Sequence, residues 1–128
     1  LEIESEAYSN LSIAHKTNDK KYKIVHISGV NFMDFEECKK QMIKVDDELK
    51  TMFSSFRRTE ENRKHEYDKT GNSFGEVITY WAKNNDSINI SCINWSDKIT
   101  KKNNWGDNLS ISITKIEFLK WQLYDANR

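Results

Sequence analysis

The chain has 128 residues, of which 37% are apolar and 12% aromatic, a composition that excludes a disordered segment and suits one folded domain. Twenty basic and twenty acidic residues give a formal net charge of zero, which argues against a nucleic-acid partner because such binding rests on a basic excess. No apolar run is long enough to span a membrane, and the four scattered glycines supply no phosphate-binding loop. We predict a single domain over residues 1–128, in which residues 1–8 are a polar end that is disordered or derived from cloning.

Two strands are predicted before any helix. A weak alternation at Leu11 and Ile13 indicates a short edge strand. Branched residues dominate the segment 21–30, which indicates a second strand with both faces partly covered, and Gly29 is expected to end it.

The clearest predicted element is a long helix that follows the second strand. Seven apolar residues recur at spacings of three and four, which places them along one face of a helix that packs on a sheet. These residues are Phe35, Cys38, Met42, Val45, Leu49, Met52 and Phe56. Asn31 is the expected N-cap, and Asp34 follows where a negative charge suits the helix N-terminus. The mixed-charge run over residues 59–72 is predicted either to extend this helix into solvent or to form a loop.

Three further strands are predicted in the second half of the chain, where branched and aromatic residues dominate. They span 75–83, 87–95 and 109–118, with a tight turn at 84–86 and a longer hairpin loop at 96–108. The tail over residues 116–127 fits either a last strand or a short helix. Because no second helix separates these strands, a parallel sheet is disfavoured. We therefore expect an α+β fold, in which a curved antiparallel sheet of four to five strands packs on one long helix, in the layout of cystatin-like or NTF2-like folds.

The two cysteines both fall where they would face the interface between this helix and the sheet. Cys38 lies on the apolar face of the helix, and Cys92 alternates with Ile88 and Ile90 along a predicted strand. At such an interface, Cα atoms about 5.5–6 Å apart can be bridged. We predict a Cys38–Cys92 disulfide, which indicates an oxidising compartment such as the periplasm or the cell exterior. The alternative is a pair of free, buried cysteines that serve as small apolar residues.

The titratable residues form no pattern that names an enzyme. The cysteines and histidines, which are Cys38, Cys92, His15, His26 and His65, have no metal-ligand spacing, so we expect neither a metal nor a cofactor. A buried Cys92 would be a poor nucleophile even beside His26, because burial makes a thiol inert. The carboxylates, Asp46 among them, are expected to be solvated. We therefore expect a protein without enzymatic activity.

The loop at 98–108 is the strongest candidate for binding. Trp105 is expected near its tip, where an exposed tryptophan is typical of protein–protein hot spots. Lys98, Lys101, Lys102 and Asp107 surround it and are predicted to contact another protein. A basic and aromatic loop also suits nucleic acid or a membrane surface, and Trp105 could instead fold back over the sheet edge.

These patterns lead to one expected function and two alternatives. We expect a periplasmic or extracellular protein-binding domain, such as a toxin-immunity or inhibitor protein or the periplasmic domain of a membrane-anchored regulatory or assembly factor. Leu1 in place of a methionine fits the removal of a leader or an anchor. The first alternative is a carrier or sensor for a small apolar ligand, in a pocket walled by Met42 and Met52. The second alternative is a small enzyme of NTF2-like layout.

Overall fold

The computed structural model of the chain describes residues 2–3, 8–18, 20–21 and 23–125. Most of the end that is predicted to be disordered, namely residues 1 and 4–7, therefore lies outside the described residues. Within that end, Glu2–Ile3 form a short strand, and the ring of Tyr8 lies against Gly29.

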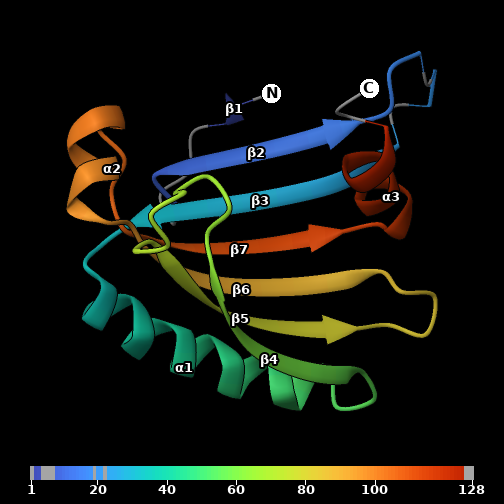
Figure 1. The fold of residues 1–128 in the computed structure, drawn as a ribbon. Helices are drawn as coiled ribbons and strands as arrows, with labels where there is room; N and C mark the ends of the chain where they lie inside the picture. Colours follow the sequence, from blue (N-terminus) through green and yellow to red (C-terminus); the bar gives the residue numbers. More distant parts are fainter. Residues whose placement is uncertain (1, 4–7, 19, 22, 126–128) are drawn as a thin grey trace.

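Seven strands and three helices make up the described part of the chain (Figure 1). The strands are β1 (Glu2–Ile3), β2 (Asn10–His15), β3 (Ile24–Phe32), β4 (Arg57–Lys64), β5 (Phe74–Trp81), β6 (Ser87–Asn94) and β7 (Asn108–Thr114). The helices are α1 (Phe35–Met52), α2 (Asp97–Asn103) and α3 (Ile116–Tyr124). Every strand pair is antiparallel, in the order β1-β2-β3-β7-β6-β5-β4. The predicted α+β fold with an antiparallel sheet on a long helix is confirmed, whereas the expected four to five strands were too few.

The strand at the far edge of the sheet, β4, takes up residues 59–64 of the run predicted to be a helix extension or a loop, whereas residues 65–72 do form a loop. α1 ends at Met52, and the chain turns through Phe53, whose ring packs on Phe56 with centroids 5.0 Å apart. Beyond this turn, Arg57–Lys64 pair with β5 along their whole length. Charged residues protect an edge strand from pairing with other chains, so the charge here marks an edge. The prediction was wrong for residues 59–64, because a strand that is polar on both faces has no hydrophobic period.

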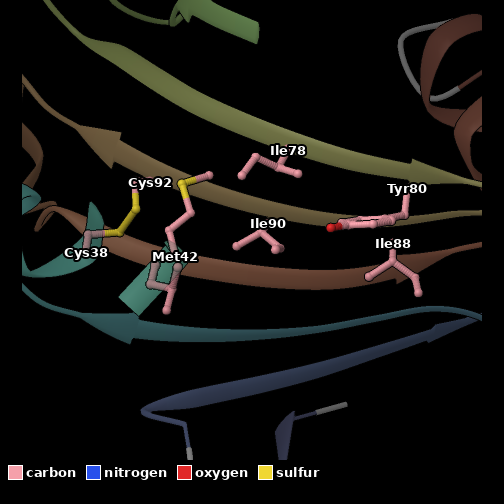
Figure 2. Close-up of a cluster of buried hydrophobic side chains, with 8 residues drawn as sticks. Cys38, Met42, Ile78, Tyr80, Ile88, Ile90 and Cys92 are labelled. Carbon is pink, nitrogen blue, oxygen red and sulfur yellow. A yellow bond between two sulfur atoms is a disulfide. The ribbon is translucent and has the colours of Figure 1, made fainter. Parts of the chain in front are cut away.

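α1 packs on one face of the sheet, and this interface holds the core (Figure 2). The buried residues of the core are Cys38, Met42, Ile78, Tyr80, Ile88, Ile90, Cys92 and Leu109. Val45 and Leu49 pack against them, which confirms the predicted apolar face of the helix as far as Leu49. Met52 does not continue it: its side chain is 69% exposed, because the helix ends there and Phe53 and Phe56 pack at the margin of the core instead.

The start of α1 also differs from the prediction. β3 continues past Asn31, and the N-cap is Asp34, whose side chain accepts a hydrogen bond from the Glu37 backbone N–H (2.9 Å). Gly29 does not end the strand, because it lies within β3, where an added Cβ atom would come within 2.7 Å of the Tyr8 ring. The glycine therefore allows a ring to lie directly on the strand backbone.

The later elements follow the predicted order, with two refinements. The tight turn at 84–86 is confirmed, and Asn85 adopts the left-handed conformation (φ 66°) that asparagine tolerates in turns. The loop predicted over 96–108 contains the short helix α2, which buries Ile99. The tail forms a helix, α3, and not a last strand, so β7 ends at Thr114.

The face of the sheet opposite α1 has a different character, and we call it the open face. Side chains alternate along a strand, so this face carries the residues that lie between those of the core. α3 lies over one end of it, where the ring of Phe118 stacks on His26. The β4–β5 connection, residues 65–73, lies over the other end, near α2 (Figure 1). Between these two ends, no described helix covers the open face.

Candidate functional site

The Cys38–Cys92 disulfide is present, as the sequence predicts. It joins the start of α1 to β6, with Cα atoms 5.8 Å apart. Both cysteines are fully buried inside the helix–sheet interface (Figure 2). Neither cysteine is a free thiol, so the alternatives of free cysteines and of a Cys92 nucleophile are wrong. His26 lies on the opposite face of the sheet from Cys92.

An aromatic cluster lies where the β4–β5 connection meets α2. We call it the aromatic edge and define it as Tyr67, Trp95 and Trp105. The ring centroid of Trp105 lies 4.9 Å from that of Trp95 and 4.7 Å from that of Tyr67. Tyr67 is 45% exposed and Trp105 38% exposed. Trp105 therefore packs back on Trp95, as one predicted alternative had it, and still presents part of its ring to solvent.

A buried carboxylate holds the aromatic edge in place. Asp68 accepts hydrogen bonds from the hydroxyls of Thr70 (2.7 Å), Ser73 (2.7 Å) and Ser96 (2.8 Å). These hydrogen bonds, that of Thr70 foremost, hold the pKa of Asp68 well below its usual range. Ser96 is also the N-cap of α2, so this network ties the β4–β5 connection to the start of that helix. The aromatic edge is thus ordered before any partner arrives, which lowers the entropic cost of binding.

The predicted lysines and the predicted aspartate of this loop have different surroundings. Lys98, Lys101 and Lys102 are exposed on α2, where spacings of three and four place them on one side of the helix. Asp107 is half-buried, and its side chain accepts a hydrogen bond from the Trp95 backbone N–H (2.9 Å). The lysines therefore face solvent beside the aromatic edge, whereas Asp107 positions one of its rings.

A shallow hollow of about 550 Å³ adjoins the aromatic edge at the end of β3. Phe32 and Trp95 contribute aromatic rings to its lining, and Phe32 is 55% exposed. Gly106 lies beneath Phe32, where an added Cβ atom would come within 3.3 Å of the ring. Aromatic surface therefore continues from the aromatic edge toward the start of α1.

At the place where the sequence predicts an apolar-ligand pocket between helix and sheet, the structure has a small hollow lined by charged side chains. It measures about 200 Å³ and lies at the rim of α1, where Met42 forms part of its lining. Lys39, Asp46 and Glu60 also line it, so an apolar ligand would meet charged groups there. Met52 lies away from this hollow, exposed at the end of α1.

A second buried carboxylate, Asp46, joins α1 to β4. Both of its oxygens accept hydrogen bonds from Arg58, at 3.0 and 2.7 Å, and one also accepts from the Tyr80 hydroxyl. Burial acts to raise the pKa of Asp46, but the hydrogen bonds from Arg58, Tyr80 and Lys50 outweigh it and lower this pKa to about 2. The prediction that Asp46 is solvated was wrong, because Arg58 and Tyr80 come from strands that the helix pattern could not place beside it.

His26 lines a hollow on the open face. Its Nδ1 lies 2.9 Å from the Thr114 hydroxyl, and its ring stacks on Phe118 with centroids 4.7 Å apart. Burial lowers the pKa of His26, which favours the neutral imidazole. The side chain can therefore both donate and accept a hydrogen bond at neutral pH.

No protein-family model, curated protein or solved structure matches this chain. Among the described residues, no helix has the length and apolar character needed to cross a membrane. The same residues include no group of three or more His, Cys, Asp or Glu side chains that could hold a metal ion. The fold and the site define a disulfide-bonded α+β domain with an ordered aromatic edge beside a basic helix.

Sequence reasoning found Trp105 and the lysines but missed the residues that support them. Tyr67 and Asp68 lie in a charged run that carries no periodic signal, and the fold alone brings them to α2. One local signal was present: Asp68 precedes Thr70 and Gly71 in the manner of a turn in which an aspartate accepts from the backbone two residues later. That signal indicates a turn but not its neighbour in space.

Proposed function

We propose that this chain is an extracytoplasmic domain that binds another protein through the aromatic edge and the basic side of α2. The exposed rings of Tyr67 and Trp105 carry this proposal: they pack on each other, and Trp105 also packs on Trp95. Tyrosine and tryptophan are enriched in binding hot spots, because they offer large contact areas and lose few rotatable bonds on binding. Removing this aromatic surface from water on association would be favourable.

The charge beside the aromatic edge indicates the chemistry of the partner. Lys98, Lys101 and Lys102 are exposed on one side of α2, so a partner with an acidic rim around an apolar centre would match them. Such complementarity accelerates association and excludes basic partners. An inhibitor or immunity protein that covers an acidic enzyme or toxin would use such a surface. A periplasmic regulatory or assembly domain of a membrane-anchored protein would use it in the same way.

The disulfide supports the extracytoplasmic part of the proposal. Structural disulfides form and persist in oxidising compartments such as the periplasm or the cell exterior. Counting thiols in the denatured, unreduced protein isolated from its natural host tests this part. We expect no free thiol, and two free thiols per chain would overturn the assigned compartment.

The binding itself is tested by capture followed by measurement with a purified partner. Wild-type protein captures partners from an extract of its host, and each captured protein is purified and its dissociation constant is measured. Trp105→Ala should weaken binding at least about thirtyfold, the effect of a typical hot-spot residue. Substituting Lys98, Lys101 and Lys102 by glutamate should slow association and reduce its dependence on salt.

Matched variants control for general effects of the substitutions. Trp121→Ala removes a tryptophan that is 51% exposed on α3, at the other end of the molecule, and should leave affinity unchanged. Equal affinities of wild type and Trp105→Ala for every captured partner would contradict the proposal. A second outcome would also contradict it. In this outcome no protein partner is found, the wild type binds anionic lipid vesicles or DNA, and the triple glutamate variant does not bind them.

A further inference from the structure

A groove on the open face has no part in the proposed function. One hollow of about 260 Å³ lies over β5, β6 and β7 and is bounded by Leu119 and Gln122 of α3. A second hollow of about 360 Å³ lies toward the β4–β5 connection. Arg63 and Asn89 line both, so the two are continuous. We call them together the sheet groove.

Polar side chains from neighbouring strands form the floor of the sheet groove. The strand register aligns one row across six strands: Ser12, Ser28, Ser112, Asn89, Thr79 and Thr59. The next row contains His26, Thr114, Ser87 and Trp81. Neighbouring strands lie about 4.8 Å apart, so hydroxyls and amides repeat at that spacing across the groove.

Two residues of this floor are buried as a whole, and their hydroxyls have hydrogen-bonding capacity that no other side chain takes up. Ser87 is 8% exposed and lines the groove, yet its hydroxyl bonds to no other side chain in the described part of the chain. Thr79 is 5% exposed and accepts a hydrogen bond from Asn89 Nδ2 (3.0 Å), so its own proton remains to be donated. A ligand that covers these hydroxyls must replace the hydrogen bonds that they make to water, so the floor suits a ligand that both donates and accepts hydrogen bonds.

The charges at the margin of the groove argue against an ionic ligand. Glu61, Glu66, Arg63 and Lys64 are two acidic and two basic side chains, which leaves no net charge to hold an ion. Arg63 and Glu61 also approach each other, with 3.5 Å between Nη1 and Oε1. An apolar ligand fits no better, because it would leave the floor hydroxyls without partners.

Trp81 contributes a large aromatic ring to the lining of the first hollow, and the Arg57 guanidinium lies over this ring, 5.4 Å from its centre. The Trp81 Nε1 donates to the Thr59 hydroxyl (3.0 Å), which fixes the ring beside the polar row. A sugar ring carries hydroxyls around its rim and C–H groups on its faces. It can therefore meet polar groups and an aromatic ring together, as this groove presents them.

We propose that the sheet groove binds an uncharged oligosaccharide. Its hydroxyls bond to Ser87, Thr79 and Asn89, and one sugar ring packs against Trp81. The inference is independent of the aromatic edge, since none of its three residues lines the groove.

Titration of the full chain with neutral hexasaccharides of glucose, mannose, galactose and N-acetylglucosamine tests the proposal. We expect at least one to bind with a dissociation constant of about 1 mM or tighter, and to shift amide resonances of β5, β6 and β7. The Ser87→Ala/Asn89→Ala variant should bind this hexasaccharide at least about tenfold more weakly, because two hydrogen-bonding groups are lost. Thr51→Ala, which removes an exposed hydroxyl from α1, is the matched control and should bind as wild type.

Several outcomes would overturn the assignment. Absence of shifts with every hexasaccharide would do so, as would equal affinity of wild type and the double variant. A neutral peptide of serine and glycine that shifts the groove resonances, while all hexasaccharides are inert, would assign the groove to extended peptides. If the double variant fails to fold, Ser112→Ala repeats the test at a half-buried floor position. Trp105→Ala should retain full sugar binding, which separates this result from that of the aromatic edge.

Discussion

Along β6, the residues of one face and those of the other differ sharply in character. Ile88, Ile90 and Cys92 are buried against α1, where the disulfide and the core hold helix and sheet together. Asn89 and Ser91 lie between them on the open face, half-buried and polar. The covered face thus supplies most of the free energy of folding, and the open face can carry groups chosen for other reasons. Substitutions should therefore affect stability strongly on one face and weakly on the other.

Reduction of the disulfide should give the largest loss on the covered face. The bridge joins residues 54 positions apart in sequence, and a loop of this length corresponds to about 4 kcal/mol in the chain-entropy model. We expect reductant to lower the free energy of unfolding of the wild type by about that amount, measured by urea denaturation. The Cys38→Ala/Cys92→Ala variant is the control, since reductant should leave its curve unchanged. Superimposable wild-type curves with and without reductant would refute this account of the bridge.

Two neighbouring arginines of β4 lie on opposite faces of the sheet, so substituting each of them compares how much the two faces contribute to stability. Arg58 pairs with the buried Asp46, whereas Arg57 lies on the open face, 5.4 Å from the centre of the Trp81 ring. Arg58→Ala should destabilise the fold by about 3 kcal/mol, because it leaves a buried carboxylate without its main partner. Arg57→Ala should cost about 1 kcal/mol or less, the range of an exposed cation–π contact. Both are measured by chemical denaturation at neutral pH, and equal losses would remove the distinction between the faces.

Lowering the pH should reduce the free energy of unfolding, because the carboxylate of Asp46 becomes protonated. The pKa of Asp46 is about 2 in the fold, and it is about 3.9 in an unfolded chain. Its ionised form therefore stabilises the fold fully above pH about 4, and this contribution, about 2 kcal/mol, is lost as the pH falls toward 2. Asp68 adds to the same loss, because its pKa is also lowered.

Unfolding free energies measured at a series of pH values check this window. In the Asp46→Asn variant, the free energy of unfolding should fall less between pH about 4 and pH about 2 than in the wild type. The variant should also be less stable than the wild type at neutral pH. Asp47→Asn, a change at the exposed neighbouring position, should leave the wild-type profile intact. A wild-type stability that stays constant as the pH falls through this window would show that Asp46 is not ion-paired in solution.

The sequence also predicted the covered face of the sheet better than it predicted the polar surfaces. The period of α1 and the alternation of β6 predicted the Cys38–Cys92 bridge, because apolar residues repeat with the geometry of the element that buries them. β4 was missed because its residues are polar on both faces. The site was only partly predictable for a related reason: Trp105 could be found as a single exposed aromatic, but its contacts with Tyr67 and Trp95 arise from the tertiary fold.

The smallest effect on stability is expected at the centre of the open face. Ser112 is half-buried in the polar row, and its hydroxyl bonds to no other side chain among the described residues. Ser112→Val should change the free energy of unfolding by no more than about 0.5 kcal/mol, because valine suits a strand and no hydrogen bond is lost. Ile111→Ser, one position earlier on the covered face of β7, should cost about 2 kcal/mol, since Ile111 packs against the core. Urea denaturation of both variants measures the difference.

The outcome at Ser112 decides how the polar row is understood. If Ser112→Val lowers the free energy of unfolding as much as Ile111→Ser does, the hydroxyls of the polar row contribute to folding. Stability alone then accounts for a polar open face. If valine is neutral or stabilising, folding does not require a serine at this position. The hydroxyl is then explained by what it contacts from outside the fold, and the same variant should lose sugar binding while it keeps its stability.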